Sequence, residues 1–411
     1  MTSADQQIEV TGSEAAVRPL DGVTVVDLTR VLSGPYCTMQ LADMGARVIK
    51  IERPGSGDDT RAWGPPFVGG ESAYFLSVNR NKESVTLNFK HPAGRDLLER
   101  LIARADVLVE NFRPGTLDAL GLSYAAVAAR HPRLIYCSIS GFGQTGPRRD
   151  QPGYDAVVQA EGGLMSITGD ADGPPYRLGV AIADLVSGMF AANGIALALL
   201  ARARTGRGQL VDVSMLDSVA ALLTYQAALA FATDQAPRRM GNRHPMIVPY
   251  ETFEASDGEF VLAVGNDDQW RRFCAAAGLD ALGRDVRFAT NPDRVTRYDD
   301  LRPLIAAGLK LGTRDHWIAM LTEAGVPAGA VRGVDEALAD PQIAARRMVE
   351  TVTHLTAGPL RLLGVPIKLS DTPGAVSTPP PLLGQHTATV LERDLGLDRA
   401  AVDHLRQVRA I

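Results

Sequence analysis

The stretch "GVTVVDLTRVLSGPYCTMQLADMGARVIKIE", residues 22–52, decides the fold class of this chain. Apolar runs at 22–28 and 47–52 are short enough for buried strands, and the segment 33–45 between them has the pattern of a helix. Gly45 follows that pattern, at the position where a glycine commonly ends a helix. The stretch therefore predicts a strand–helix–strand unit.

The same alternation continues downstream. The sequence predicts, in chain order, a strand at 84–89, a helix at 94–105, a strand at 106–111, a helix at 117–132 and a strand at 134–143. Strands that alternate with helices predict an α/β fold, in which helices cover both faces of a parallel sheet.

Two long apolar runs follow, and we expect helices at about 185–204 and 214–233. Both approach the length of a membrane span, which needs about 20 strongly apolar residues. They are rich in alanine and contain polar residues such as Asn193 and Gln226, so we interpret them as buried core helices. After a linker at 234–250, a hairpin with an "SDG" turn and further helical patterns predict a smaller α+β domain.

The composition excludes several classes of protein. A net charge of −5, with acids and bases interspersed, offers no basic face for nucleic acid. Cys37, Cys137 and Cys274 lie far apart and cannot all pair, which indicates a reducing, cytoplasmic setting. The 7 histidines show no paired zinc-ligand spacing, so we expect no metal site.

No dinucleotide-binding motif follows the first strand. The sequence there, "TRVLSGPYC", has Gly34 alone in place of G-x-G-x-x-G, which argues against a nicotinamide-dependent dehydrogenase. Another nucleotide-like ligand at the carboxyl edge of the sheet remains open. Arg53, Arg80, Lys82 and Arg113, all near strand ends, would face phosphates in such a crevice; for any one of them taken alone, a solvated surface charge is the favoured interpretation.

Longer segments carry a family resemblance. They are "PLDGVTVVDLTRVLSGP", "GARVIKIERPGSGDDTR", "NRNKESVTLNFK", "VENFRPGTLDALG", "AIADLVSGMFAANGI" and "RTGRGQLVDVSMLDS". In these segments the chain resembles the class III CoA-transferases of the CaiB/BaiF superfamily, which include formyl-CoA transferase and carnitine CoA-transferase. The resemblance extends from about residue 19 to the end of the chain.

The resemblance implies a large Rossmann-like domain built from both chain ends, a smaller inserted α+β domain, and an interlocked homodimer. The expected division is a flexible N-terminal tail at 1–18, the first part of the large domain at 19–225, a linker and the small domain at 226–335, and a return to the large domain at 336–411. Nucleic acid and membrane are not expected partners.

By the same resemblance, Asp184 matches the family's nucleophile. A carboxylate at the start of a helix accepts backbone N–H bonds and lies at the positive end of the helix dipole. Both effects favour the ionised form, which is the nucleophile. The alternative is that Asp184 only caps the helix.

The resemblance assigns further residues to substrate binding. Arg53 matches the residue that holds the CoA nucleotide, and the segments that line CoA contribute Leu32, Ser33, Leu87, Lys90, Asn111, Phe112 and Arg113. Tyr154 and Asp155 match neighbours of the nucleophile. Gly265 and Asn266 lie in "GNDDQ", in the place of the loop that covers the site in formyl-CoA transferase.

Two departures from formyl-CoA transferase affect the phosphate contacts. Ala119 stands in place of a CoA-binding arginine, and Pro152 in place of a lysine. We therefore expect Arg148 or Arg149 to supply part of the missing charge. The "GNDDQ" loop also lacks the run of glycines, which argues against formate and oxalate as substrates.

The resemblance implies a two-stage transfer of CoA from an acyl-CoA thioester to a free carboxylic acid. Asp184 would form first a mixed anhydride and then an aspartyl-CoA thioester. The CoA thioester is a substrate, and no permanently bound cofactor is needed. Backbone N–H groups at the start of helix 185–204 and at Gly265 are the expected donors to the oxyanion.

Two other functions remain open. A 2-methylacyl-CoA racemase shares the superfamily, but its "GHD" motif here has Tyr154 in place of histidine, and tyrosine, with a reference pKa of about 10, is a poor base. A non-catalytic CoA-binding protein is the other alternative. The acceptor acid is not evident: Arg243 or His244 in "GNRHP" would suit a second carboxylate, unless this segment is only a surface linker.

Overall fold

The computed structural model describes residues 17–411, so the expected tail at 1–18 lies outside it except for its last two residues. The chain divides into two compact units. The first takes the described residues up to Val158 with Ala181–Ser218 and Gln342–Ile411, and the second takes Gln159–Val180 and Val219–Pro341. Residues 159–180 therefore belong to the second unit, whereas the sequence division places them in the large domain.

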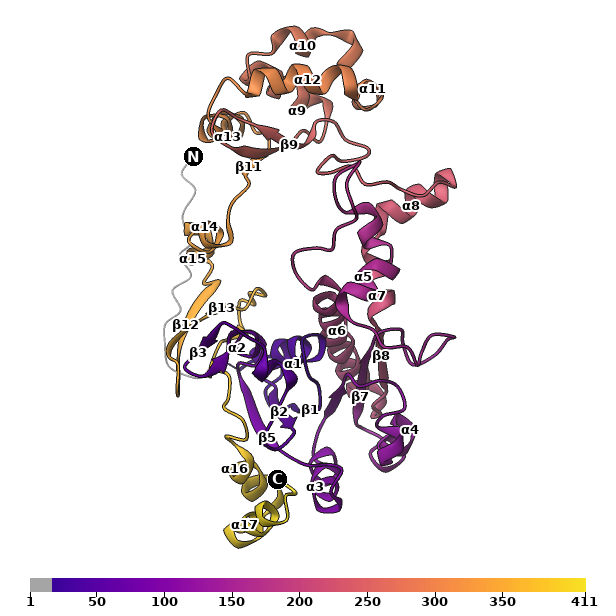
Figure 1. Ribbon diagram of the computed structural model, residues 1–411, viewed down its shortest axis with the longest axis vertical. Helices are drawn as coiled ribbons and strands as arrows, with labels where there is room; N and C mark the ends of the chain where they lie inside the picture. Colours follow the sequence, from indigo (N-terminus) through magenta and orange to yellow (C-terminus); the bar gives the residue numbers. More distant parts are fainter. Residues whose placement is uncertain (1–16) are drawn as a thin grey trace. The chain divides into compact units, whose positions relative to one another are not determined.

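The first unit is built on a parallel sheet of six strands, shown in Figure 1. The strands are β1 (Thr24–Asp27), β2 (Arg47–Glu52), β5 (Lys82–Thr86), β6 (Val107–Glu110), β7 (Ile135–Ser140) and β8 (Leu210–Ser214). Their order is β5-β2-β1-β6-β7-β8, and Val26 of β1 faces Ile49 of β2 on one side and Leu108 of β6 on the other. This sheet confirms the predicted α/β fold.

The strand order reverses between β1 and β6. The chain proceeds from β1 through β2 to β5, then crosses back to β6 and continues through β7 to β8. Loops that leave the carboxyl ends of β1 and β6 therefore diverge and open a crevice, which is where ligands bind in sheets of this kind.

Helices from both ends of the chain cover the sheet. Strand residues Val26, Ile49 and Leu108 share one buried core with α3 (Pro92–Ile102), α4 (Tyr124–Arg130), α16 (Thr387–Leu395) and α17 (Arg399–Gln407). The C-terminal segment is held there by the backbone of Ala410, which accepts a hydrogen bond from Asn88 N at 2.8 Å. Residues more than three hundred positions apart thus complete one core.

The helices α1 (Ser33–Asp43) and α6 (Ile182–Thr205) pack directly on each other. Gly188 permits this approach, because a Cβ at this position would lie 2.6 Å from the carbonyl oxygen of Ser33. The N-terminal part of α6 is therefore held against the N-terminus of α1. Among the described helices, α6 has the length and apolar composition of a membrane span, but it packs on α1, β7 and β8 as a core helix does.

The expected helix at 214–233 is wrong in one respect. The chain forms two helices there, α7 (Met215–Leu222) and α8 (Thr224–Thr233), which are bent by 72° to each other. Thr224 at the break has φ 37°, in the left-handed region that a β-branched residue rarely adopts. Apolar composition alone does not reveal such a break.

The second unit contains the predicted hairpin and its helices. Strands β9 (Tyr250–Glu254), β10 (Glu259–Ala263) and β11 (Ala328–Ala330) form an antiparallel sheet in the order β11-β10-β9. Helices α9 (Asp267–Ala276), α12 (Tyr298–Leu309) and α13 (Arg314–Glu323) contribute to the same core, around Phe260, Trp270 and Leu321.

The remaining short elements connect these parts. They are η1 (Asp59–Ala62), β3 (Phe67–Val68), β4 (Glu71–Ser72), α2 (Ala73–Val78), η2 (Asp118–Leu120), α5 (Asp155–Glu161), η3 (Leu164–Ile167), α10 (Asp280–Arg284), η4 (Val286–Phe288), α11 (Asn291–Thr296), α14 (Val334–Leu338), α15 (Pro341–Ala345), β12 (Val349–His354) and β13 (Gly358–Leu363).

Candidate active site

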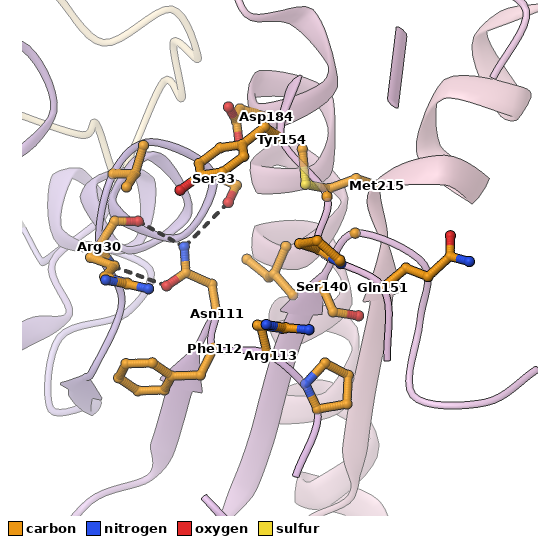
Figure 2. A pocket seen from close by; sticks show the side chains of 16 residues that line it. Arg30, Ser33, Asn111, Phe112, Arg113, Ser140, Gln151, Tyr154, Asp184 and Met215 are labelled. Atoms are coloured by element: carbon orange, nitrogen blue, oxygen red, sulfur yellow. Dashed lines mark hydrogen bonds between the residues drawn. The ribbon is translucent and has the colours of Figure 1, made fainter. Parts of the chain in front are cut away.

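A pocket of about 140 Å³ lies where the strand order reverses. Its walls come from the loops after β1 and β6, from the carboxyl ends of β7 and β8, and from the first turn of α6. Figure 2 shows these side chains, which include Arg30, Ser33, Asn111, Phe112, Arg113, Ser140, Gln151, Tyr154, Asp184 and Met215. The structure thus brings five of the expected binding residues to the pocket that Asp184 lines: Ser33, Asn111, Phe112, Arg113 and Tyr154.

Asp184 is not the cap of α6. The N-cap position is Ala181, and the helix begins at Ile182, so Asp184 is the third residue of the first turn. The capping oxygen comes instead from Asp155, whose Oδ1 accepts a hydrogen bond from Ala183 N at 2.9 Å. Asp184 lines the pocket, and since the bond to the helix N-terminus comes from Asp155, the interpretation of Asp184 as a simple helix cap is wrong.

The electrostatic expectation for Asp184 is also wrong. Burial, with the nearby charge of Asp155 as the second cause, raises the pKa of Asp184 from 3.8 to about 7. The hydroxyl and the backbone N–H of Ser33 act in the opposite direction, since both donate hydrogen bonds to the carboxylate. The hydrogen bonds from Ser33 favour the ionised form of Asp184, but the cost of removing water from the carboxylate is larger.

Asn111 fastens the two loops that flank the crevice. Its Oδ1 accepts from Arg30 N at 2.9 Å, and its Nδ2 donates to Arg30 O at 2.7 Å and to Ser33 Oγ at 3.4 Å, as the dashed lines in Figure 2 show. One amide side chain after β6 thus fixes the loop after β1, including the serine that bonds Asp184.

Two arginines bring positive charge to the pocket. Arg113 is exposed, and its Nη2 donates to the carbonyl of Asp150 at 2.9 Å, which orients the guanidinium. Arg30, which no sequence motif singles out, pairs with Asp59 at 2.8 Å and lies 5.9 Å from the ring of Phe112. Both line the pocket.

Other expected CoA-binding residues lie outside the lining of this pocket. Leu32 packs in a small buried cluster with Met39 and Val78, and Leu87 is buried in the main core. Arg53 and Lys90 are exposed, after β2 and β5 respectively. Their assignment to CoA remains a prediction.

Arg80 and Lys82 do not face phosphates, and they are not solvated either. Arg80 pairs with Asp43 at 2.7 Å, and Lys82 pairs with Asp27 at 3.3 Å, in each case with both side chains buried. An unpaired charge at these depths would be too costly, so each cation is matched by an internal carboxylate. Both interpretations of these two residues are therefore wrong.

Arg148 and Arg149 lie in the loop between β7 and α5. The guanidinium of Arg148 lies 4.1 Å from the ring of Phe142, and its Nε donates to Gln151 Oε1 at 2.9 Å. Arg149 pairs with Asp150 at 3.4 Å. Whether either replaces the contacts missing at Ala119 and Pro152 stays a prediction.

Gly265 and Asn266 lie in the second unit, between β10 and α9. Gly265 N donates to Gln269 Oε1 at 2.7 Å, and Asn266 caps α9 by accepting from Gln269 N at 2.8 Å. Gly265 N, one of the expected oxyanion donors, is therefore already engaged. Ala183 N in the first turn of α6 is engaged as well, since it donates to Asp155.

Tyr74 is a neighbour of Asp184 that the sequence does not reveal. Burial, followed by the charges of Asp184 and Asp155, raises the pKa of Tyr74 to about 12, so the phenol keeps its proton at neutral pH. It belongs to the short helix α2, where one tyrosine in an apolar run gives no sign of function. Within residues 17–411, no group of three His, Cys, Asp or Glu side chains has the arrangement of a metal site.

Comparison with known proteins identifies the relatives of this chain. The family model described as CoA-transferase family III matches residues 20–387. Succinyl-CoA:glutarate CoA-transferase of Mus musculus is 42% identical over 390 residues, which cover 95% of this chain and 89% of the relative. Acetyl-CoA:oxalate CoA-transferase of Acetobacter aceti is 46% identical, over 87% of this chain and 92% of its own.

A solved structure of the same family is also similar to this chain. A CaiB/BaiF family protein from Brucella suis superposes with a TM-score of 0.82 at 43% sequence identity. The match covers 92% of this chain and 100% of that one.

Proposed function

Since the chain belongs to CoA-transferase family III, and is therefore a CoA-transferase, we propose that it moves CoA between carboxylic acids through a thioester on Asp184. The observation that supports this proposal is that two neighbouring aspartates have different roles. Asp155 caps α6 from outside the helix, and this leaves the carboxylate of Asp184 on the wall of the pocket.

The proposed transfer takes place in two half-reactions, each with an anhydride intermediate. The carboxylate of Asp184 attacks the thioester carbonyl, the C–S bond breaks, and CoA leaves as the thiolate while a mixed anhydride forms. The thiolate then attacks the Asp184 carbonyl of the anhydride, which releases the donor acid as a carboxylate and leaves aspartyl-CoA. The acceptor carboxylate repeats these two steps in reverse order, and Asp184 is regenerated.

The pocket supports this chemistry in two ways. Partial burial removes water from the carboxylate, which strengthens it as a nucleophile and protects the anhydride from hydrolysis. Ser33 bonds the carboxylate and is itself held by Asn111, so the nucleophile is positioned before substrate arrives. Arg30 and Arg113 supply positive charge beside it for the anionic substrates.

We propose short dicarboxylic acids as the substrates. The relatives named above act, by their names, on succinyl-CoA and glutarate or on acetyl-CoA and oxalate, and all of the free acids in these names are dicarboxylates. The similarity to an oxalate transferase also weakens the sequence-based argument against oxalate.

We also propose that the chain acts as a cytoplasmic homodimer. Four large apolar side chains on α6, Met189, Phe190, Leu197 and Leu200, are 46 to 61% exposed and lie on one face of the helix. A soluble protein rarely leaves such a face in water, and a second copy would cover it. All three cysteines are free and buried, which suits a reducing compartment.

Trapping the activated aspartate tests the proposal. The protein is incubated with succinyl-CoA and hydroxylamine, digested, and analysed by mass spectrometry. The expected product is a hydroxamate at Asp184, absent from an Asp184→Asn variant and still present in an Asp172→Asn variant, which alters an exposed carboxylate. Normal transfer by Asp184→Asn, or a hydroxamate at another residue, would contradict the assignment.

A further inference from the structure

Glu110 is a buried acid beside the pocket that the transfer chemistry does not use. It is the last residue of β6, at the carboxyl edge of the sheet, and it is 6% exposed. The four residues that follow it, 111–114, all line the pocket that contains Asp184. Whatever fixes the end of β6 therefore fixes one wall of this pocket.

Glu110 differs from the other buried acids of the first unit because it has no cation. Four of the described ones are in ion pairs with a lysine or an arginine: Asp27, Asp43, Glu52 and Asp58. Glu110 forms no ion pair with any described residue. A buried carboxylate without a cation lowers stability, so a charge pair does not explain this side chain. The explanation lies in the groups that it does contact.

Two neutral donors hold the carboxyl group of Glu110. Its Oε2 accepts a hydrogen bond from Phe112 N at 2.8 Å, and its Oε1 accepts one from the hydroxyl of Ser138. Ser138 lies opposite Glu110 on the neighbouring strand β7, and the three residues that follow Ser138 also line the pocket. One side chain thus joins the ends of two strands that lead into two walls of the pocket.

The network continues to a third strand. Ser138 Oγ accepts from Gln144 Nε2 at 2.7 Å, and Gln144 N donates to Asp212 Oδ2 at 3.2 Å. Asp212 lies opposite Ser138 on β8. Because Ser138 accepts from Gln144, its single hydrogen is the one that it gives to Glu110.

The titratable groups around Glu110 are not cations. Burial raises the pKa of Glu110 to about 7, against the two hydrogen bonds that it accepts. The groups whose charges interact with it come from η2, β7 and β8: Asp118, Tyr136, Cys137 and Asp212. Glu110 keeps an oxygen that can accept from Phe112 N in both of its protonation states, so this contact holds on either side of neutral pH.

Asn111 is the residue that the bond from Phe112 N to Glu110 encloses. A side chain that accepts from the N–H two residues later fixes the backbone between them. The amide of Asn111 bonds the loop after β1, including Ser33, as Figure 2 shows. Ser33 in turn donates to Asp184 with its hydroxyl and its backbone N–H. Hydrogen bonds therefore connect Glu110 to the carboxylate in the pocket.

We propose that Glu110 is a positioning residue: it sets the orientation of Asn111, which keeps the donors of Ser33 on the carboxylate of Asp184. The proposal rests on the proposed function in taking Asp184 as the nucleophile. Without Glu110, Phe112 N loses its acceptor and the turn around Asn111 opens. The bonds from Ser33, which favour the ionised form of Asp184, then weaken.

Two variants separate this turn from the titration of Glu110 itself. Glu110→Gln keeps an acceptor for Phe112 N, Glu110→Ala has none, and neither titrates at this position. With succinyl-CoA and glutarate, kcat/KM of Glu110→Ala should be about 10- to 100-fold below that of Glu110→Gln. Its acidic limb, which reports the ionisation of Asp184, should lie about 0.5 to 1 pH unit higher. Glu110→Met fills the same space without an acceptor, and takes the place of Glu110→Ala if the alanine variant does not fold.

A control at the other end of β6 tests for a general loss of stability. Asp106, directly before this strand, accepts from Thr24 N at 2.9 Å and pairs with Arg202 at 2.9 Å. Asp106→Ala should lower the free energy of unfolding and leave the acidic limb in place. A limb that moved in this control would overturn the proposal, because lost stability alone would then explain the shift.

A double variant tests the route through Asn111. If Glu110 acts through Asn111, adding Glu110→Ala to Asn111→Ala should change kcat/KM by less than about twofold. Effects of the two substitutions that multiply would overturn the proposal.

A measurement without turnover separates this proposal from the proposed function. The pH dependence of the stability difference that Asp184→Asn makes gives the pKa of Asp184 in the folded chain, and it is measured in the Glu110→Gln and Glu110→Ala backgrounds. A higher value with alanine supports the positioning role whether or not Asp184 is the nucleophile. Equal values, or equal acidic limbs, would overturn it, whereas normal transfer by Asp184→Asn would overturn only the proposed function.

Discussion

Asp184→Asn should make the fold more stable, and by an amount that depends on pH. Burial and Asp155 raise the pKa of Asp184 from 3.8 to about 7, so the folded chain holds this proton more tightly than the unfolded chain does. A carboxyl group of this kind costs stability as it ionises: its penalty is absent at low pH, grows between about pH 4 and pH 7, and then remains constant. Asparagine has nearly the same shape and does not titrate, so the variant escapes the penalty.

The magnitude follows from the size of the shift. Each pH unit between the unfolded and folded pKa values contributes about 1.4 kcal/mol. Between pH 5 and pH 7 the stability advantage of Asp184→Asn should therefore grow by about 2 kcal/mol, because the slope decreases as the pH approaches the folded pKa, and above pH 7 the advantage should level off. Urea unfolding of both proteins at intervals from pH 5 to pH 8, followed by circular dichroism, measures this difference.

A matched control isolates the pocket from a general charge effect. Asp172→Asn removes an exposed carboxylate, and its stability difference from the unaltered chain should be nearly constant over the same pH range. If the advantage of Asp184→Asn were also constant from pH 5 to pH 8, Asp184 would titrate normally in the folded chain, and the argument that burial controls this carboxylate would be refuted.

Three further predictions follow from the same contacts. Asp155→Asn keeps an acceptor for Ala183 N but removes the second cause of the raised pKa of Asp184, so the acidic limb of the kcat/KM profile should move to lower pH; an unmoved limb would show that Asp155 exerts no such effect. Asn111→Ala removes the hydrogen bonds that join the two loops and should lower the free energy of unfolding by about 1 to 2 kcal/mol in urea titrations, whereas no loss would mean that the loops hold without it. Leu197→Glu places a charge on the apolar face of α6 and should convert the proposed dimer to monomers in sedimentation velocity, while Leu311→Glu, at an exposed leucine of the second unit, should not; a dimer that survives Leu197→Glu would exclude this face as the interface.

Elements with strong local patterns were predictable from the sequence. The first strand–helix–strand unit matches β1, α1 and β2, because apolar period and glycine stops are properties of neighbouring residues. The break at Thr224 was not predictable, because the run 218–233 is uncharged and rich in alanine and leucine throughout, and the bend depends on what packs around it.

In the candidate site, too, some features were predictable from the sequence and others were not. An isolated acid beside a long apolar run singles out Asp184, but whether Asp184 caps the helix or lines the pocket depended on Asp155, 29 positions earlier in the chain. Whether Arg80 and Lys82 are solvated or buried likewise depended on remote residues, Asp43 and Asp27. A lysine or arginine at a strand end has the same local sequence in both cases.

The sequence by itself determined the alternation of strands and helices and the family resemblance. Through that resemblance it also identified Asp184 as the candidate nucleophile. Only the tertiary structure decided the strand order that opens the crevice, the capping of α6 by Asp155, and the burial that raises the pKa of Asp184. The physical reason is that periodicity and turn preference act between near neighbours in the chain. Desolvation, ion pairing and capping from a distance depend on which remote segments the fold brings together.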